Sequence, residues 1–215
     1  MNENRLRAHL LRTARALNSS GLNHGKAGNV SVRCGDGFLI TPSGIAYEKL
    51  TTKQLVRVDA NDQWADGLMP STEWSMHRGV YAAHAEIQAL VHAHPRHATA
   101  LACTRQGIPA FHYMVAVAGG HDIPCCAYET FGTDALAHAV TKALSNRKAC
   151  LMANHGLMAT GADLDSALSL ATEVENLAAQ YLLAKQAGNM VLLTQTEMDA
   201  VMEQFRSHYG QSRLD

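Results

Sequence analysis

The chain has 215 residues, of which 47% are hydrophobic and 17% charged, proportions that are typical of a globular protein rather than a disordered one. This length fits one large domain with a substantial core, which we expect to span residues 1–215. The formal charge of −1, from 18 basic and 19 acidic residues without long like-charge runs, gives no reason to expect a nucleic-acid partner or an anionic membrane surface.

The first third of the chain predicts one helix and then short strands. Apolar residues recur at spacings of three and four over residues 6–17, which predicts a helix that ends near Gly21. Residues 30–33 and 38–41 are expected to form a hairpin around a glycine-containing turn, and residues 56–59 another short strand. The glycines of this region lack the spacing of a P-loop or a dinucleotide-binding fingerprint.

The segment from Pro70 predicts the start of a second helix, which runs to about Ala83. Ser71 and Thr72 are expected to cap it. Glu73 suits the positive end of the helix dipole, and as an isolated residue it needs no other explanation.

The apolar run over residues 87–91 predicts a buried strand that leads into His92-Ala93-His94. Side chains two residues apart on a strand point to the same face, so His92 and His94 are expected to project together. Pro95 cannot continue a central strand, which places the pair at the strand's end. Two such imidazoles suit a divalent metal, although hydrogen bonds alone could also account for them.

The remaining elements alternate between helices and extended segments. We expect a short helix over 98–103, irregular extended segments at 108–114 and 123–128, and a helix capped by Thr133. Residues 149–153 form a predicted strand that brings a third histidine, His155, to a strand end, where Gly156 would allow a sharp turn.

Two helices are predicted to complete the chain. The first runs from about Asp163 to Ala187, and its apolar stripe indicates core or a subunit interface. Thr194 and Glu197 form a capping-box pattern for a last helix through Phe205. The fold class that follows is α/β, a single layered domain with a mainly antiparallel central sheet flanked by helices.

Three neutral imidazoles and one carboxylate could form a catalytic zinc site. Such sites have three protein ligands and an open position, and His92, His94 and His155 would supply the three nitrogens. Glu73 could be a fourth, displaceable ligand. The metallohydrolase pattern His-x-His-x-Asp-His competes for the first two histidines, but Arg96 occupies the place of its aspartate.

Seven stretches of the sequence, in order and spread over nearly the whole chain, resemble the class II aldolases of the aldolase/adducin superfamily. Within this family the likeness is greatest to enzymes that act on L-fuculose 1-phosphate. The stretches are Ala27-Gly28-Asn29-Val30-Ser31, Ile40-Thr41-Pro42-Ser43-Gly44, Pro70-Ser71-Thr72-Glu73, His92-Ala93-His94, His112-Tyr113-Met114, Tyr128-Glu129-Thr130-Phe131-Gly132-Thr133 and His155-Gly156.

The resemblance implies an aldehyde-lyase with one zinc per subunit. Its reaction would reversibly cleave a ketose 1-phosphate, L-fuculose 1-phosphate or a close analogue, into dihydroxyacetone phosphate and an aldehyde such as L-lactaldehyde. His92, His94, His155 and Glu73 would hold the metal. Glu73 would become the acid/base at carbon once substrate displaces it.

The resemblance also implies the rest of the site. A phosphate cradle would be formed by Gly28, Asn29, Ser43, Gly44, Ser71 and Thr72. Family members are fourfold-symmetric homotetramers with sites between subunits, so Tyr113, Phe131 and Tyr209 would come from the neighbouring chain. Tyr113 would be the proton donor to the aldehyde oxygen, with Tyr209 a second catalytic tyrosine.

One residue departs from the family pattern, and two other functions compete. Lys26 stands where relatives often carry threonine, and its charge either tightens anion binding or sits in solvent. A pentulose-phosphate 4-epimerase on the same fold would usually have aspartate in place of Glu73. A non-enzymatic, adducin-like scaffold would be expected to lose the metal ligands.

The cysteines and the N-terminus favour a cytoplasmic protein. The five cysteines are an odd number without a C-x-x-C pair, which argues against a disulfide framework and favours a reducing compartment. The polar, charged N-terminus does not resemble a signal peptide, and no apolar run is long enough to cross a membrane. These observations and the balanced charge favour neither a membrane nor a nucleic-acid partner, and the family resemblance implies a small phosphorylated sugar as the partner.

Overall fold

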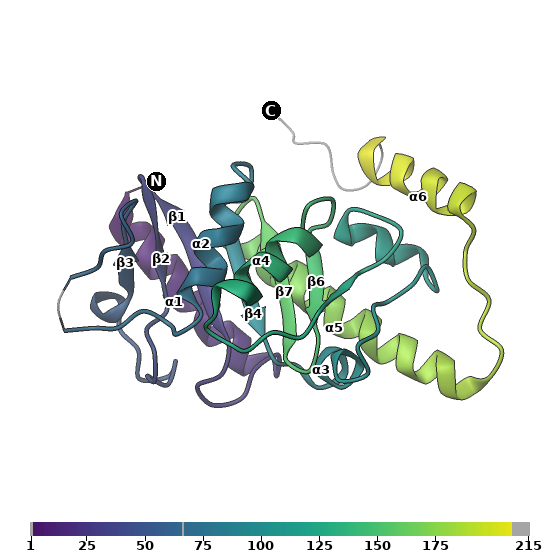
Figure 1. Ribbon diagram of the computed structural model, residues 1–215, viewed down its shortest axis with the longest axis horizontal. Coiled ribbons are helices and arrows are strands. Elements are labelled where there is room, and N and C mark those ends of the chain that lie inside the picture. Colours follow the sequence, from purple (N-terminus) through teal and green to yellow (C-terminus); the bar gives the residue numbers. More distant parts are fainter. Residues whose placement is uncertain (1, 66, 208–215) are drawn as a thin grey trace.

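A seven-stranded sheet with helices on both faces forms the centre of the computed structural model, which describes residues 2–65 and 67–207 (Figure 1). The strand order is β3-β2-β1-β4-β7-β6-β5, and every pair is antiparallel except β5 with β6. This confirms a single layered α/β domain with a mainly antiparallel sheet. The strands are β1 (Asn29–Cys34), β2 (Gly37–Ile40), β3 (Val56–Val58), β4 (Ala89–Ala93), β5 (Cys125–Cys126), β6 (Ala149–Met152) and β7 (Gly156–Gly161).

The helices divide between the two faces of the sheet. α1, α3 and α5 share one buried apolar cluster with the sheet, while α2 and α4 share another on the opposite face. Two short 3₁₀ helices, η1 and η2, lie in connections, and α6 packs against η2. The helices are α1 (Glu3–Ser19), η1 (Thr52–Gln54), α2 (Trp74–Ala83), α3 (Arg96–Ala102), η2 (Tyr113–Ala118), α4 (Asp134–Ala143), α5 (Leu164–Ala187) and α6 (Gln195–Ser207).

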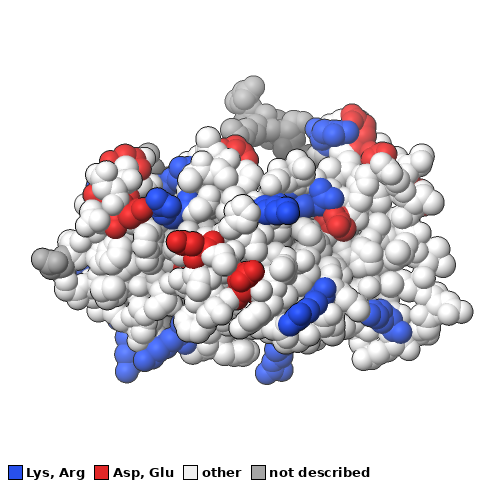
Figure 2. Space-filling model, in the orientation of Figure 1, with Lys and Arg blue, Asp and Glu red and all other residues white. Residues whose placement is uncertain are grey.

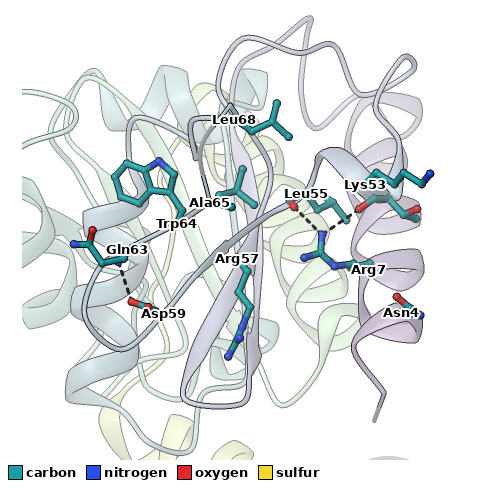
Figure 3. Close-up of a pocket in the computed structure, with 12 residues that line it drawn as sticks. Asn4, Arg7, Lys53, Leu55, Arg57, Asp59, Gln63, Trp64, Ala65 and Leu68 are labelled. Carbon is teal, nitrogen blue, oxygen red and sulfur yellow. Dashed lines mark hydrogen bonds between the residues drawn. The ribbon is translucent and has the colours of Figure 1, made fainter.

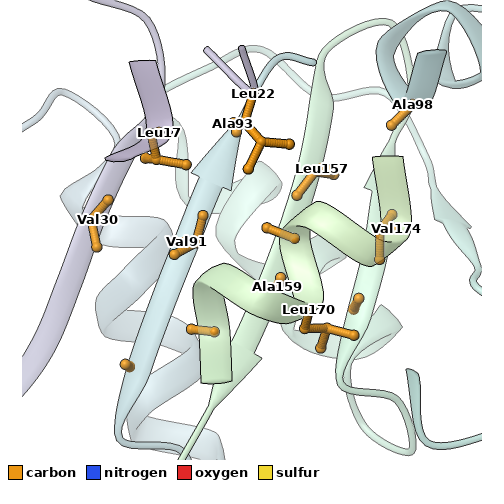
Figure 4. Close-up of a cluster of buried hydrophobic side chains, with 14 of the residues drawn as sticks. Leu17, Leu22, Val30, Val91, Ala93, Ala98, Leu157, Ala159, Leu170 and Val174 are labelled. Carbon is orange, nitrogen blue, oxygen red and sulfur yellow. The ribbon is translucent and has the colours of Figure 1, made fainter. Parts of the chain in front are cut away.

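The alternation of side chains along β4 decides where its histidine points. Val91 and Ala93 belong to the cluster beneath α1 and α5, which also contains Leu157 and Val174 (Figure 4). Leu90 has the opposite parity and packs on the α2 side. His92 shares the parity of Leu90, so the strand aims it at α2.

One central strand was not predicted. β7 lies between β4 and β6, and it begins directly after His155. The sharp turn before it uses Asn154 in the left-handed region, with φ 54°, and not the expected glycine. Gly156 is required for a different reason, because a Cβ atom there would overlap the carbonyl oxygen of Ala93 on the neighbouring strand.

The start of α2 also differs from expectation. The predicted capping roles of Ser71 and Thr72 are wrong, because Glu73 occupies the N-cap position and its side chain makes no capping hydrogen bond. Ser71 instead supports the entry to the helix, where its carbonyl accepts from the backbone N–H of Trp74. The Glu73 carboxylate is thereby left free for other contacts.

Other predicted helix boundaries are confirmed. The Thr133 side chain accepts from the backbone N–H of Leu136 at the start of α4. At the start of α6, Thr194 and Glu197 exchange the two hydrogen bonds of a capping box. Tyr113, expected in an extended segment, is instead the first residue of η2. Within the described residues, no helix is both long and apolar enough to cross a membrane.

Candidate active site

A cavity of about 510 Å³ opens where β1 begins, β4 ends and α2 starts. The lining comes from six separate parts of the sequence, which the fold brings together. Lys26 lies in the same lining, together with Tyr128 and Glu129. The predicted site residues in the lining are Gly28, Asn29, Ser43, Gly44, Ser71, Thr72, Glu73, His94, Phe131 and His155.

The three predicted histidines converge at the base of this cavity. His92 Nε2 and His94 Nε2 lie 2.9 Å apart, and ligand atoms of His92, His94 and His155 all fall within 4.8 Å of one another. His92 is fully buried, while the other two are partly exposed. This arrangement of three imidazole nitrogens with one side open to a cavity fits the donor set of a catalytic metal centre.

Glu73 completes the cluster from the start of α2. Its Oε2 atom lies 3.2 Å from His92 Nε2, and its Oε1 atom lies 3.1 Å from His155 Nε2. The carboxylate is buried, with 7% of the residue exposed. A nitrogen-rich cluster with one carboxylate at this range could hold a divalent transition metal, with Glu73 as an oxygen ligand.

Charge balance in the cluster depends on His92 and Glu73 together. Burial raises the pKa of Glu73, but the positive charge of His92 and the contacts with His155 outweigh it and lower the pKa overall. Burial lowers the pKa of His92, and the Glu73 charge reverses this shift so that it is raised. A bound cation would take the place of the proton on His92 as the counter-charge to Glu73.

His94 is poised to act as a neutral ligand. Burial and the nearby charges of His92 and His155 lower its pKa to about 3. Its imidazole therefore keeps a lone pair at neutral pH, as a metal ligand requires. His92 is oriented from behind, because its Nδ1 atom donates to the carbonyl of Leu157 at 2.8 Å, which directs Nε2 into the cluster.

The other end of the cavity has the character of an anion cradle. Gly28 adopts φ +70°, and a Cβ atom there would lie only 2.6 Å from the His92 carbonyl oxygen, so only glycine lets the loop run this close to the strand. Hydroxyls of Ser43 and Thr72 are exposed beside the first turn of α2. Backbone N–H groups and hydroxyls at a helix start favour a bound phosphate.

The predicted aromatic residues are not all in this cavity. Phe131 lines it and is 65% exposed. Tyr113 is 50% exposed on η2 and does not belong to the lining. Tyr209 lies outside the described residues.

A larger cavity, of about 860 Å³, lies away from the histidines, between α1, η1 and β3 (Figure 3). Its two arginines are already engaged. Arg7 donates to the carbonyl of Leu55 at 2.7 Å, and Arg57 pairs with Asp36 at 2.6 Å. Size alone therefore does not mark this cavity as the reaction site.

Sequence analysis named Asn29 and Ser71 as cradle residues but missed His77, which lies behind Glu73. Asn29 donates from Nδ2 to Glu73 Oε2 and to Ser71 Oγ, both at 2.9 Å, so it joins the carboxylate to the cradle. The side-chain amide oxygen of Asn29, Oδ1, contacts Nε2 of the buried His77. The four-residue spacing of Glu73 and His77 puts them on one helix face, but the sequence does not show that Asn29 lies opposite that face.

Comparison with known proteins gives the family. The model of the Class II Aldolase and Adducin N-terminal domain matches residues 8–182. The chain is 46% identical to the L-fuculose phosphate aldolase of Escherichia coli O6:H1, covering 97% of each chain. It is 45% identical to a 5-methylthioribulose-1-phosphate/5-deoxyribulose-1-phosphate aldolase of Rhodospirillum rubrum, covering 97% of this chain and 95% of that protein.

Solved structures agree with this assignment. A structure of L-fuculose 1-phosphate aldolase superimposes with a TM-score of 0.90 at 39% identity, covering 94% of this chain and 96% of that one. The L-fuculose-1-phosphate aldolase of Thermus thermophilus gives 0.76 at 34% identity, covering 87% and 99%. Because sequence, fold and the histidine cluster agree, the chain belongs to the class II aldolase and adducin family and is a class II aldolase, a metal-dependent lyase.

Proposed function

We propose that this chain is a zinc aldolase that reversibly cleaves a ketose 1-phosphate into dihydroxyacetone phosphate and an aldehyde. The observation that carries the proposal is the convergence of three imidazoles and Glu73 beside an anion cradle in one cavity. Zinc is favoured because nitrogen-rich sites with one displaceable carboxylate suit it. Each subunit would hold one ion.

The protein's residues divide the work of the reaction. A divalent metal held by His92, His94 and His155 would act as the Lewis acid for the negative enediolate oxygen that carbon–carbon cleavage leaves behind. Glu73 would leave the metal when substrate binds and then exchange a proton with the enediolate carbon. Tyr113 would exchange a proton with the aldehyde oxygen, and Tyr209 would be a second catalytic tyrosine.

The phosphate end of the substrate would lie in the cradle described above. The backbone at Gly28 and the hydroxyls of Ser43, Ser71 and Thr72 would donate to its oxygens. Asn29 would belong to the cradle through its hydrogen bond to the Ser71 hydroxyl. Gly44, which also has positive φ, would let the second loop approach the anion, and Phe131 would flank the substrate.

The identity of the sugar rests on the relatives. One relative is named for L-fuculose phosphate and another for 5-methylthioribulose 1-phosphate and 5-deoxyribulose 1-phosphate. These sugars share the dihydroxyacetone phosphate half and differ in the aldehyde, so we propose L-fuculose 1-phosphate or a close analogue. A panel of aldehydes, with L-lactaldehyde among them, assayed with dihydroxyacetone phosphate would rank the substrates by kcat/KM.

The release of free dihydroxyacetone phosphate separates an aldolase from a 4-epimerase on the same fold, since an epimerase rejoins the fragments. Incubation with ketose phosphates should liberate it. A chain that binds no zinc and cleaves no ketose phosphate would instead be a scaffold. Treatment with a chelator should abolish cleavage and added zinc should restore it, whereas substrate trapped on a lysine by borohydride would contradict the metal mechanism.

We also infer that the working enzyme is a cytoplasmic homotetramer with sites between subunits. Support comes from large apolar side chains that one chain leaves exposed, among them Phe131 at 65% and Val191 at 86%. Tyr113 is exposed and lies outside its own chain's cavity lining, which suits a residue that acts in a neighbour's site. Light scattering that finds a fully active monomer at the assay concentration would contradict this inference.

A further inference from the structure

A row of hydrogen-bonded, buried polar side chains leads from Glu73 away from the cavity. We call these five residues, Glu73, Asn29, His77, Ser31 and Tyr81, the relay. Asn29 donates from Nδ2 to Glu73 Oε2 at 2.9 Å, and Asn29 Oδ1 contacts His77 Nε2. His77 Nδ1 lies 2.6 Å from Ser31 Oγ, which lies 2.8 Å from the hydroxyl of Tyr81. All five residues are buried, and His77 and Ser31 are completely so.

The helix period of α2 and the strand alternation of β1 bring the relay residues together. Glu73, His77 and Tyr81 are four residues apart, so they follow one face from the start of α2 along the helix. Asn29 and Ser31 alternate on β1, with Asn29 opposite His92 in the antiparallel pair. The α2 face therefore meets the strand face that also carries a proposed metal ligand.

The chemistry of Glu73 fixes the direction of every hydrogen bond in the relay. An ionised carboxylate only accepts, so Asn29 must turn its amide nitrogen toward Glu73 and its oxygen toward His77. His77 must then donate from Nε2 and accept at Nδ1. Ser31 must donate to that acceptor, which leaves its oxygen to accept from the hydroxyl of Tyr81.

Burial keeps His77 and Tyr81, the two titratable residues of the relay other than Glu73, neutral. It lowers the pKa of His77 to about 3 and raises that of Tyr81. At neutral pH His77 therefore carries one proton, which the geometry assigns to Nε2, and Tyr81 keeps its hydroxyl hydrogen as a donor.

We propose that His77 is a positioning residue for the aldolase reaction. It holds the Asn29 side chain so that the amide nitrogen, and not the amide oxygen, faces the Glu73 carboxylate. The inference rests on the proposed role of Glu73 in proton transfer. Without the Nε2–H group of His77, the Asn29 amide loses the contact that distinguishes its two ends. A flipped amide would set its oxygen against the Glu73 carboxylate, and two acceptors in contact repel.

The two neighbours of Asn29 differ in how they respond to such a flip. Ser71 carries a hydroxyl that both donates and accepts, so it can pair with either end of the amide. Glu73 can only accept and has no alternative. Loss of His77 should therefore impair proton transfer much more than phosphate binding.

The test compares His77→Leu with His77→Gln in zinc-loaded enzyme acting on L-fuculose 1-phosphate. Leucine has no donor, whereas glutamine can place an N–H group near the position of Nε2. We expect His77→Leu to lower kcat about ten- to a hundredfold, the range for loss of a hydrogen bond to a charged group, with KM within about threefold. His77→Gln should retain most of kcat, and zinc content should be unchanged in both.

Met76→Leu is the matched control for repacking α2, because Met76 is the adjacent buried residue and is not part of the relay. It should have wild-type kcat. If His77→Leu matches wild type in kcat, or if His77→Gln is as impaired as His77→Leu, the inference is overturned. Wild-type enzyme that releases no dihydroxyacetone phosphate from any ketose 1-phosphate would instead refute the proposed function.

A second measurement does not depend on activity. Nitrogen-15 NMR of histidine-labelled wild-type protein, with His77→Gln used for assignment, reports the tautomer of His77. We expect the neutral Nε2–H form to persist from about pH 6 to pH 8. A neutral Nδ1–H form, or protonation within this range, would overturn the inference.

Discussion

Glu73 contacts two histidines through different carboxylate oxygens, and Asn29 donates to the oxygen that faces His92. In the proposed mechanism, the Asn29 hydrogen bond would hold the carboxylate beside the substrate after it leaves the metal. The three histidines do not depend on Glu73 for their convergence, since they come from the ends of β4 and β6. Changes at Glu73 should therefore separate proton transfer from metal binding.

We predict that Glu73→Gln abolishes both cleavage and hydrogen exchange into dihydroxyacetone phosphate while zinc is retained. A positioned acid/base group typically accelerates a reaction about 10²–10⁴-fold, so each rate should decrease by a factor in that range. Tyr113→Phe should lose most cleavage and keep exchange, because the aldehyde oxygen exists only when the second substrate is present. Deuterium incorporation followed by NMR, the cleavage rate and the zinc content of each variant provide the measurement.

The outcome that contradicts this division of labour is specific. It would be a Tyr113→Phe enzyme that stops exchange as completely as Glu73→Gln, with zinc content and assembly intact. Exchange in the wild-type enzyme without aldehyde is the positive control.

Lys26 supplies a positive charge at the rim of the same cavity, beside Gly28 and Ser43. We predict that Lys26→Thr weakens competitive inhibition by inorganic phosphate several-fold, because a charge on an anion site contributes about 1 kcal/mol when exposed. The effect should shrink at high salt, since exposed charges are screened. Lys49→Thr is the matched control, as Lys49 is exposed nearby and does not line the cavity. Equal inhibition constants in wild type and Lys26→Thr would leave this lysine as a solvent-facing residue.

At the scale of elements, local patterns predicted most of the framework. The apolar run before His92 and the break at Pro95 predicted β4, and the periodicity after Asp163 predicted α5. β7 was missed because Gly-Leu-Met-Ala-Thr-Gly has neither alternation nor a concentration of β-branched residues. Its strand conformation is imposed by pairing with β4 and β6 on both sides, which no local pattern encodes.

The candidate site divides in the same way. Its proposed metal ligands and cradle residues were predicted from histidines at strand ends and from family motifs. His77 was not, because a histidine inside a helix is ordinary until the register of β1 places Asn29 and Ser31 opposite it. Nor could the sequence place Tyr113 relative to the cavity, since that depends on how η2 and α6 pack.

The cap of α5 provides a test at this scale. The Asp163 side chain accepts from the backbone N–H of Ser166 at 2.7 Å, and the pair forms a capping box. We predict that Asp163→Ala lowers the free energy of unfolding by about 1 kcal/mol, the usual effect of losing such a cap. Chemical denaturation of the zinc-loaded protein at neutral pH measures it.

The pH dependence of this cap follows from the same hydrogen bonds. Those from Ser166 lower the pKa of Asp163 below its ordinary value. The folded state therefore binds the proton less readily than the unfolded state, so the extra stability is present above the unfolded pKa of about 3.9 and is lost as pH falls through the folded pKa. Asp163→Asn keeps an acceptor without the charge and should lack this acid-dependent part. If wild type and Asp163→Asn lose stability in parallel below about pH 4, the cap's ionisation is not responsible.

At the scale of the whole molecule, a three-layer domain leaves apolar and aromatic side chains exposed around the cavity and near α6. Acidic and basic side chains are interspersed on the face seen in Figure 2, in keeping with the net charge of −1. No single-sign field covers that face among the described residues, which suits a small-molecule substrate more than a polyanion. The exposed apolar residues suit contacts between copies of the chain. They are Met69, Tyr113, Tyr128, Phe131, Leu183, Val191 and Leu192.

If neighbouring chains complete each site, two inactive variants should restore activity when they assemble together. A chain with Tyr113→Phe keeps Glu73, and a chain with Glu73→Gln keeps Tyr113. In a fourfold-symmetric ring, half of the mixed interfaces therefore contain one intact pair. Random assembly of equal amounts in a symmetric oligomer makes about one site in four intact, and we predict cleavage at about that fraction of the wild-type rate after co-expression. A double variant carrying both substitutions, co-expressed with Glu73→Gln, is the control that should stay inactive. Mixed oligomers, verified by differently tagged chains, that remain as inactive as their parents would show that Glu73 and Tyr113 act within one chain.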